Sequence, residues 1–318
     1  MTTSRTNTAH SASTMFLLMR RTFWHPRYWF TWLGIGVLRS ISQLPFGWQL
    51  GLGKCIGTLC FYTMRRRRHI AQVNLQLCFP ELTAQQRLAL LRQNFQSTGI
   101  ALCEMATAWW AKPQNLPPLI QFEGREYFEA AIQKGKGVIM LCAHFTTLEM
   151  CGRLLAHDYP IHAMYRPVKN KLFDTVMLQA RQNVFAATLK RDNMRAIIKS
   201  LKQGANLYYA GDQDYGRKYS VFAPFFGIPA ASIVAVLRMA RLTGASIVPF
   251  MHYRTNTPQS GYVIRALPAL NSLPSGDDIA DMTYINQLIE NFVRECPEQY
   301  LWIHRRFKTR PDKEPRPY

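Results

Sequence analysis

The chain has 318 residues, enough for one large α/β domain with additions or for two small domains. Its formal net charge of +20 favours anionic partners, among them nucleic acid, an acidic membrane surface, phosphorylated lipid and an acidic carrier protein. The seven cysteines are odd in number and form no C-x-x-C pair. This pattern argues against a disulfide framework and indicates reduced thiols in a protein that faces the cytosol.

The N-terminal part is strongly basic. Residues 1–15 are rich in Ser and Thr and are predicted to be disordered, since they offer little apolar surface to bury. No acidic residue precedes Glu81, whereas ten lysines and arginines do, four of them in the run 65–68. Residues 16–68 are therefore predicted to form a basic and aromatic anchoring region that suits an anionic membrane leaflet.

Two modes of membrane attachment are open for this region. The apolar stretch from 29 to about 49 matches the ~20 residues that cross a bilayer, but Arg39 and Pro45 interrupt it. The alternative is an interfacial helix with Trp24 and Trp29 at headgroup depth. A cleaved signal peptide is not expected, because basic residues flank the apolar run on both sides and no small-residue cleavage site follows it.

A long helix is predicted from Gln85 to about Trp110, because Thr83 and Gln86 fit a capping box and apolar residues recur at helical spacing. From Ile120 onward strands alternate with helices, which predicts an α/β fold with a mixed, largely parallel sheet flanked by helices. The predicted strands are 138–143, 161–165, 206–210, 245–252 and 261–267. The predicted helices are 148–156, 171–186, 193–203, 232–243 and about 278–296.

His144 follows the first of these strands. An apolar run of this length is typical of a strand buried on both faces, and open α/β sheets bind ligands at the carboxyl ends of their strands. Glu149 lies in the first turn of the next helix, where a carboxylate can orient the imidazole as a general base for a hydroxyl group. Alternatively, Glu149 completes a capping box with Thr146, and His144 is an ordinary surface residue.

Polar side chains also follow the next two strands. Arg166 comes after strand 161–165. It is predicted to bind a phosphate or a developing oxyanion, or alternatively to be an ordinary exposed arginine. Asp212 and Asp214 come after strand 206–210. Sugar-hydroxyl recognition, orientation of cationic side chains and turn chemistry all remain open for them. A D-x-D site for a divalent metal lacks a third ligand, so no metal is predicted.

Further along, Arg217 and Lys218 are predicted to contact an anion or to form a solvated basic turn. Residues 221–229 form an apolar loop that would line a hydrocarbon groove, dip into a membrane or simply pack. The tail 302–311 interleaves aromatic and basic residues, a pattern that in isolation suggests nucleic acid. If the three strands that end in polar groups are parallel neighbours, those groups open on one edge and form a single site.

Together these motifs resemble the late acyltransferases of lipid A biosynthesis, in particular the lauroyl and palmitoleoyl type. The likeness extends from His25 to the C-terminus. The motifs that carry it are His144-x4-Glu149, Tyr165-Arg166-Pro167, Asp212-Gln-Asp-Tyr-Gly-Arg217, the run from Ser220 to Phe226, and the tail from Trp302 to Pro311. The related glycerolipid acyltransferases share the His-x4-acid motif, so the resemblance implies a similar fold.

The resemblance implies a Gram-negative inner-membrane enzyme, with residues 69–318 as an acyltransferase domain on the cytoplasmic face. It implies transfer of a fatty acyl group from acyl carrier protein to a hydroxyl of a Kdo-bearing lipid A precursor, with inner-membrane lipids as further partners, no nucleic acid and no cofactor. His144 would remove the hydroxyl proton, Glu149 would orient His144, and Arg166 or backbone amides would stabilise the oxyanion.

Three alternatives to this interpretation remain open. The first is an acyltransferase that acts on a glycerophospholipid. The second is a non-catalytic basic protein that binds lipid or nucleic acid. The third is an acyl-cysteine route through Cys142, which strand alternation disfavours because it points that side chain along a buried strand.

Overall fold

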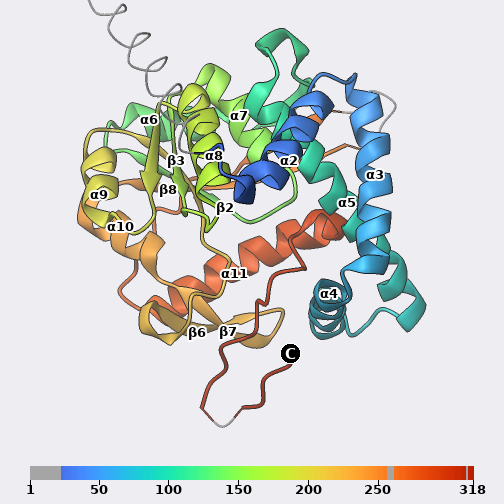
Figure 1. The fold of residues 1–318 in the computed structure, drawn as a ribbon. Coiled ribbons are helices and arrows are strands. Elements are labelled where there is room, and N and C mark those ends of the chain that lie inside the picture. The colour runs from blue at the N-terminus through green and yellow to red at the C-terminus, as the bar shows by residue number, and fades with distance from the viewer. Residues whose placement is uncertain (1–22, 256–260, 313) are drawn as a thin grey trace, which may run out of the picture.

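The computed structural model describes residues 23–318 apart from 256–260 and 313, so the predicted disorder of residues 1–15 lies outside the described residues. A seven-stranded sheet in the order β1-β9-β8-β2-β5-β3-β4 forms the centre of the molecule (Figure 1). Its strands are β1 Leu119–Glu123, β2 Val138–Cys142, β3 Ile161–Tyr165, β4 Ala187–Lys190, β5 Asn206–Ala210, β8 Ser246–Arg254 and β9 Tyr262–Ala266.

The five strands β8, β2, β5, β3 and β4 run parallel to one another, while β9 pairs antiparallel with β8 and parallel with β1. The prediction of a mixed, largely parallel sheet is confirmed. Because β2, β5 and β3 are consecutive neighbours, the segments that follow Cys142, Ala210 and Tyr165 emerge at one edge. The polar groups after these strands therefore lie on a common edge.

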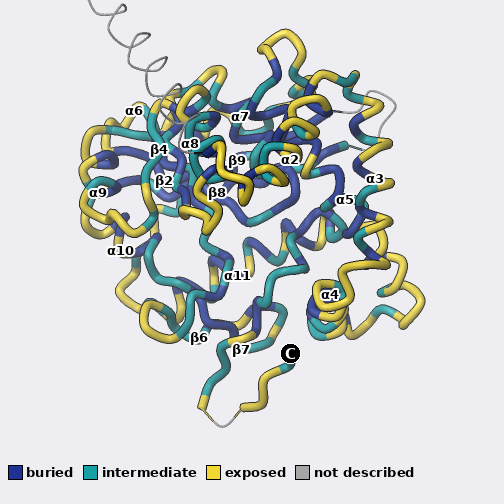
Figure 2. Tube along the Cα trace, viewed as in Figure 1, coloured by how far each residue is buried: buried dark blue, intermediate teal, exposed yellow. Residues whose placement is uncertain are grey.

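Helices cover both faces of the sheet, and the strands between them are largely buried (Figure 2). One face is covered by α6 Arg125–Gln133, α7 Leu148–Asp158, α8 Lys171–Val184 and the C-terminal part of α5 Ala84–Trp110. The other is covered by α4 Arg65–Cys78, α9 Met194–Lys202, α10 Ala235–Thr243, α11 Asp278–Glu295 and the N-terminal part of α5. The capping box predicted for Thr83 and Gln86 is formed at the start of α5.

The predicted membrane span of residues 29–49 is divided into two helices. These are α2 Trp29–Ile41 and α3 Phe46–Thr63, with Pro45 as the N-cap of α3. At ~1.5 Å per residue, α2 reaches about 20 Å, short of a ~30 Å hydrocarbon core. Among the described helices, none combines the length and the apolar composition needed to cross a bilayer.

Helix α3 packs closely on α5 through glycines. A Cβ added at Gly57 would lie 2.2 Å from the carbonyl oxygen of Phe95, and one at Gly99 would lie 2.2 Å from that of Gly53. Only a residue without a side chain fits at such a crossing. The described part of the basic N-terminal region is thus tightly packed against the α/β domain.

Some elements were not expected from the sequence. The strands β1 and β4 are short and half-buried, so they carry no clear alternation of apolar and polar residues. Residues 221–229, expected as a loop, lie in a hairpin of β6 Ser220–Phe225 and β7 Ile228–Ile233. Since Ala223 and Phe225 are fully buried in the main core, the packing interpretation of this segment is confirmed.

The C-terminal tail folds back over the domain. The side-chain amide of Asn74 donates to the carbonyl of Trp302 at 2.7 Å, and that of Asn94 donates to the carbonyl of Tyr300 at 2.6 Å. Trp302 is buried, and so is Arg306, whose guanidinium donates to the carbonyl of Ala231. The aromatic and basic residues of the tail therefore serve internal packing, which does not support a nucleic-acid interpretation.

Candidate active site

His144 and Asp212 meet across two neighbouring strands. Strands β2 and β5 pair with Cys142 opposite Ala210, so the residues two positions further on lie opposite each other on the same face. The Nδ1 of His144 lies 2.5 Å from Oδ1 of Asp212, and its backbone N–H donates to Oδ2 at 3.1 Å. Among the described residues Nε2 has no hydrogen-bond partner, and the ring is 23% exposed. The site thus presents one free imidazole nitrogen.

Asp212 is held as a buried anion. Burial alone would raise its pKa, but the charge and hydrogen bonds of His144 outweigh burial and lower the pKa of Asp212 well below its usual value. The hydroxyl of Tyr300 donates to Oδ2 at 2.9 Å and adds to this effect. A carboxylate on Nδ1 fixes the tautomer that leaves Nε2 able to accept a proton, and it stabilises the imidazolium that forms.

The C-terminal segment holds the turn that carries His144. Phe145 forms a bridge with Tyr300, the N–H of Leu301 donates to the carbonyl of His144 at 2.9 Å, and the N–H of Thr146 donates to the carbonyl of Gln299 at 2.7 Å. One segment therefore positions both the histidine backbone and the hydroxyl on Asp212. Sequence reasoning missed this contribution, because no local pattern marks a tyrosine 88 residues from Asp212.

We expect Tyr300→Phe to lower kcat about tenfold while the KM values stay close to wild type. A hydrogen bond to a charged group is worth roughly 1.5 kcal/mol or more. Its loss weakens the positioning of the Asp212 carboxylate but removes no contact with a substrate. Steady-state kinetics measure the split between kcat and KM. Tyr209→Phe is the matched control, because the buried Tyr209 hydroxyl has no partner among the described residues. A kcat as high as the control would show that Tyr300 does not position the pair.

Glu149 has partners other than His144. Its Oε1 accepts from Nε1 of Trp109 at 2.7 Å and from Nε of Arg181 at 2.8 Å, while its Oε2 accepts from Nη2 of Arg181 at 2.5 Å. Burial would raise the pKa of Glu149, but the adjacent guanidinium outweighs it and lowers that pKa. The His144–Glu149 contact expected from the spacing is not among the hydrogen bonds of the described residues, where the carboxylate on His144 is Asp212.

The capping-box alternative for Glu149 is not realised either. Thr147 is the N-cap of α7 and makes no side-chain cap hydrogen bond, while the hydroxyl of Thr146 pairs with that of Ser97 at 2.8 Å. Glu149 turns toward α8 and α5 because a half-buried carboxylate is stabilised by a full positive charge nearby, and Arg181 supplies it. No local sequence pattern marked Arg181 or Trp109 as a partner of Glu149.

Arg166 lies exposed at the carboxyl end of β3, next to β5. Its side chain has no hydrogen-bond or ion-pair partner within the described part of the chain, so it remains available to an anion. The segment that follows β4 is hydrogen-bonded to the end of β3, since the N–H of Arg191 donates to the carbonyl of Tyr165 at 3.0 Å.

The other residues predicted to contact a substrate make interactions outside the His144–Asp212 pair. The Asp214 carboxylate is buried and accepts from the N–H groups of Gly216 and Thr309, as the turn interpretation predicts. Arg217 pairs with Asp312 at 2.8 Å. Lys218 is exposed beside the ring of Tyr219. Asp212 and Asp214 thus turn to different partners, and no group of three or more potential metal ligands occurs among the described residues.

Cys142 is not placed as a nucleophile. It is 1% exposed in the middle of the sheet, and burial raises the pKa of its thiol far above the usual value. A thiol that stays protonated and inaccessible cannot attack an ester or thioester. The acyl-cysteine alternative is therefore not supported. The remaining cysteines are free thiols, as expected from their number and spacing, although Cys55 is exposed.

A second histidine lies behind the site. His252 on β8 is 1% exposed, and its Nδ1 lies 2.9 Å from the hydroxyl of Thr147. Burial is the main cause that lowers the pKa of His252 to about 3, and burial likewise lowers the pKa of His304 to about 4. Both are therefore neutral in the folded protein at neutral pH.

These two histidines predict a loss of stability in mild acid. Their pKa values are lower in the folded protein than the ~6.5 of an unfolded chain, so the unfolded state binds more protons once the pH falls below that value. Each should cost up to about 1.4 kcal/mol per pH unit between pH 6.5 and 5, where carboxylates are still charged. Urea denaturation across this range measures the slope, which should be smaller in His252→Gln. A free energy of unfolding that is constant from pH 7 to 5 would contradict the buried neutral state.

The fold and the site define an α/β enzyme with a carboxylate-oriented histidine at the carboxyl edge of its sheet, the arrangement of a general base for a hydroxyl group. The chain matches the sequence profile of the bacterial lipid A biosynthesis acyltransferases over residues 19–309. It is 39% identical to the lipid A biosynthesis palmitoleoyltransferase of Escherichia coli K12 over 92% of its own length and 95% of that protein. It is 37% identical to the lauroyltransferase of the same organism, over 92% and 96% of the two chains.

A more distant relative is the lipid A biosynthesis myristoyltransferase of Escherichia coli K12, 30% identical over 94% of this chain and 93% of that protein. The chain therefore belongs to the family of bacterial lipid A biosynthesis acyltransferases. It is an acyltransferase, which sets aside the non-catalytic interpretation of its basic charge.

Proposed function

We propose that the protein transfers a fatty acyl group from acyl carrier protein to a hydroxyl group of a Kdo-bearing lipid A precursor. The observation that carries the proposal is the His144–Asp212 pair, with one imidazole nitrogen free at the edge of the sheet. The names of the relatives place them in lipid A biosynthesis, which supports the acceptor class. The net charge of +20 suits an acidic carrier and a phosphorylated acceptor alike.

In the proposed mechanism, Nε2 of His144 removes the proton of the acceptor hydroxyl while its oxygen attacks the thioester carbonyl. Asp212 stabilises the imidazolium that results. The tetrahedral intermediate collapses to the new ester and expels the carrier thiolate, which takes the proton back from His144. Arg166, exposed on the same edge and without a partner among the described residues, is our candidate for stabilising the oxyanion together with backbone N–H groups. The reaction requires no cofactor.

We further propose that α2 and α3 attach the protein to the cytoplasmic face of the inner membrane. These helices expose large apolar side chains: Phe30 is 88% exposed, Trp48 72% and Leu33 66%. A short helix with exposed aromatic residues is typical of a segment that lies in the membrane interface. The basic residues of the same region would contact anionic lipid headgroups.

The proposal is tested by the transfer of radiolabel from a set of acyl carrier protein thioesters to a Kdo-bearing lipid A precursor, with a lysophospholipid offered in parallel as a second acceptor. Labelled lipid A precursor is the expected product, and the set of thioesters reports the preferred acyl chain. Label that appears only in the phospholipid would replace the proposed acceptor with the glycerophospholipid alternative.

We expect activity to fall as salt is raised, because the proposed contacts with carrier, acceptor and membrane are all between opposite charges at the surface. The Debye length shortens from ~10 Å at 0.1 M to ~3 Å at 1 M ionic strength, which screens such contacts. Initial rates in NaCl at fixed substrate concentration measure the effect, with a choline chloride series to separate ionic strength from sodium itself. Rates that are unchanged across both series would argue against electrostatic recruitment.

A further inference from the structure

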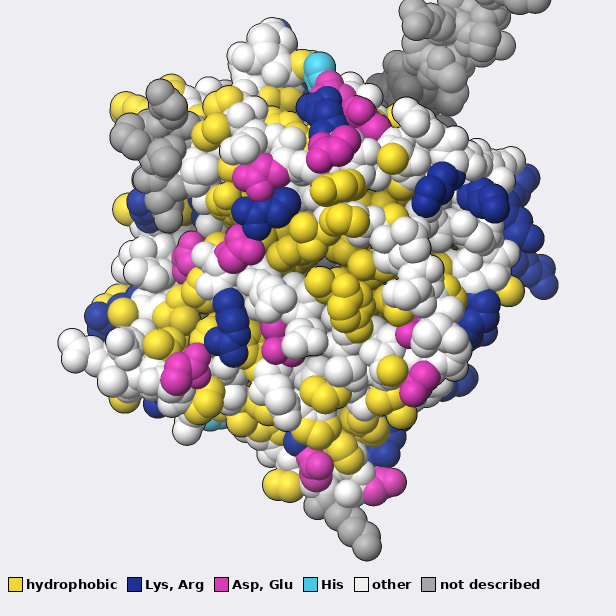
Figure 3. All heavy atoms as spheres, turned by 180° about the vertical axis from the view of Figure 1, so that it is seen from behind, with side chains coloured by type: hydrophobic (Ala, Val, Ile, Leu, Met, Phe, Trp, Pro, Cys, Tyr) yellow, Lys and Arg dark blue, Asp and Glu magenta, His cyan; other side chains and the backbone are white. Residues whose placement is uncertain are grey.

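Helix α9 presents a basic surface that no part of the described chain neutralises. It carries Arg195, Lys199 and Lys202 on its exposed side, and none of these side chains has a hydrogen-bond or ion-pair partner among the described residues. Its buried side, Ile197 and Leu201, fixes the helix on the sheet. Figure 3 shows lysine and arginine side chains gathered along the edge of the molecule where α9 lies.

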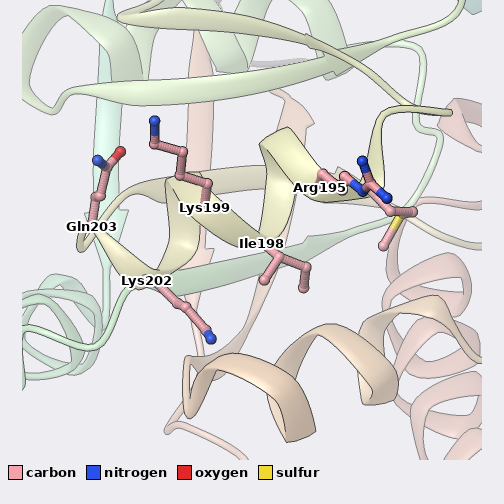
Figure 4. Close-up of a pocket in the computed structure, with 6 residues that line it drawn as sticks. Arg195, Ile198, Lys199, Lys202 and Gln203 are labelled. Atoms are coloured by element: carbon pink, nitrogen blue, oxygen red, sulfur yellow. The ribbon is translucent and has the colours of Figure 1, made fainter.

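The same surface is hollowed and partly apolar. A shallow depression of about 480 Å³ is lined by Met194, Ile198 and Gln203 together with the three cations (Figure 4). Met194, Ile198 and Lys202 follow one another at helical spacing, as do Arg195 and Lys199. An apolar strip flanked by cations matches a partner that offers both acidic and apolar side chains, since charge alone would not require the hollow.

The position of α9 links this surface to the site. The helix begins right after β4, which is parallel to β3, so Met194 and Arg195 lie at the same edge of the sheet as His144. Between them, Arg191 lies over the ring of Tyr215, in the loop that also carries Asp212. In Figure 1, α9 and α3 lie at opposite sides of the molecule. A partner from the aqueous phase can therefore reach α9 while the aromatic face of α2 and α3 is occupied by lipid.

We infer that the α9 surface docks the acyl carrier protein, the acidic partner that presents the acyl thioester. The inference rests on the proposed function and adds the place at which the donor binds. Opposite charges would speed the encounter and fix its orientation, while the apolar hollow would take an apolar side chain of the carrier. The carrier would then lie beside the edge that holds His144 and Asp212.

The test compares Lys199→Glu/Lys202→Glu with Arg92→Glu/Arg316→Glu in the full-length protein. The control pair removes the same amount of positive charge at exposed positions outside α9. We measure kcat/KM with acyl carrier protein and with acyl-pantetheine, which lacks the acidic protein, and the Kd of holo acyl carrier protein by surface plasmon resonance. In the α9 variant, kcat/KM with acyl carrier protein divided by kcat/KM with acyl-pantetheine should fall at least tenfold. The fall should come from a higher KM for acyl carrier protein, with a matching rise in its Kd. Lys199→Arg/Lys202→Arg should restore both.

Three results would overturn the inference. If the ratio of the two kcat/KM values is the same in the α9 and control variants, α9 does not dock the donor, and the proposed function is unaffected. Loss of binding to anionic phospholipid vesicles without a change in the carrier Kd would make α9 a membrane contact. If the wild-type protein transfers no acyl group from the carrier, the proposed function fails and the docking inference fails with it. Circular dichroism confirms that each variant is folded.

Discussion

His144→Ala should lower kcat by about 10²- to 10⁴-fold, the range expected when a general base is lost. The ring has only Asp212 as a side-chain partner among the described residues, and Nε2 faces no protein acceptor or donor there. Truncation therefore removes the proposed proton acceptor and leaves the surrounding core intact. Single-turnover transfer of labelled acyl groups measures the chemical step directly, and the KM values should change little.

The control for this variant is His157→Ala. His157 lies at the end of α7, is 67% exposed in its side chain and pairs only with the neighbouring Asp158. Its loss should leave both transfer and thermal stability close to wild type. If His144→Ala retained more than a tenth of the wild-type rate while folded, the edge of the sheet would not be the site of proton transfer.

Asp212→Asn should cost about 10²-fold or more in kcat, whereas Glu149→Gln should act mainly on stability. An amide at position 212 keeps the shape but no longer fixes the tautomer of His144 or compensates the imidazolium charge. An amide at position 149 leaves the half-buried Arg181 without its ion-pair partner, and the cost should approach the ~3 kcal/mol that is typical of fully buried pairs. Kinetics and urea denaturation of both variants measure the contrast.

A double-mutant cycle tests whether the loss of stability in Glu149→Gln comes from its ion pair with Arg181. If Glu149 pairs with Arg181, then Glu149→Gln with Arg181→Gln should destabilise less than the sum of the two single changes, because neither charge is then left without its partner. The opposite pattern, an inactive but fully stable Glu149→Gln beside an active Asp212→Asn, would assign the orienting role to Glu149 and reject Asp212 as the partner of His144.

Much of the architecture followed from local patterns. The predicted bounds of strands 161–165 and 206–210 agree with the structure, since apolar runs between glycines and helical stretches mark buried parallel strands. The placement of three polar clusters on one edge also followed from the assumption of parallel neighbours, and the strand order confirms it. The resemblance of the motifs to the lipid A acyltransferases agrees with the family comparison.

By itself, the sequence determined that His144, Arg166 and Asp212 each follow a predicted strand, and that the N-terminal region is basic and aromatic. Only the tertiary structure decided which carboxylate meets the histidine. Asp212 reaches it because β5 lies beside β2 in a register that sets residues 144 and 212 opposite each other, while Glu149 is drawn to Arg181. Spacing along the chain describes one element at a time, whereas the pairing of buried charges depends on strand order, register and the cations that neighbouring helices supply.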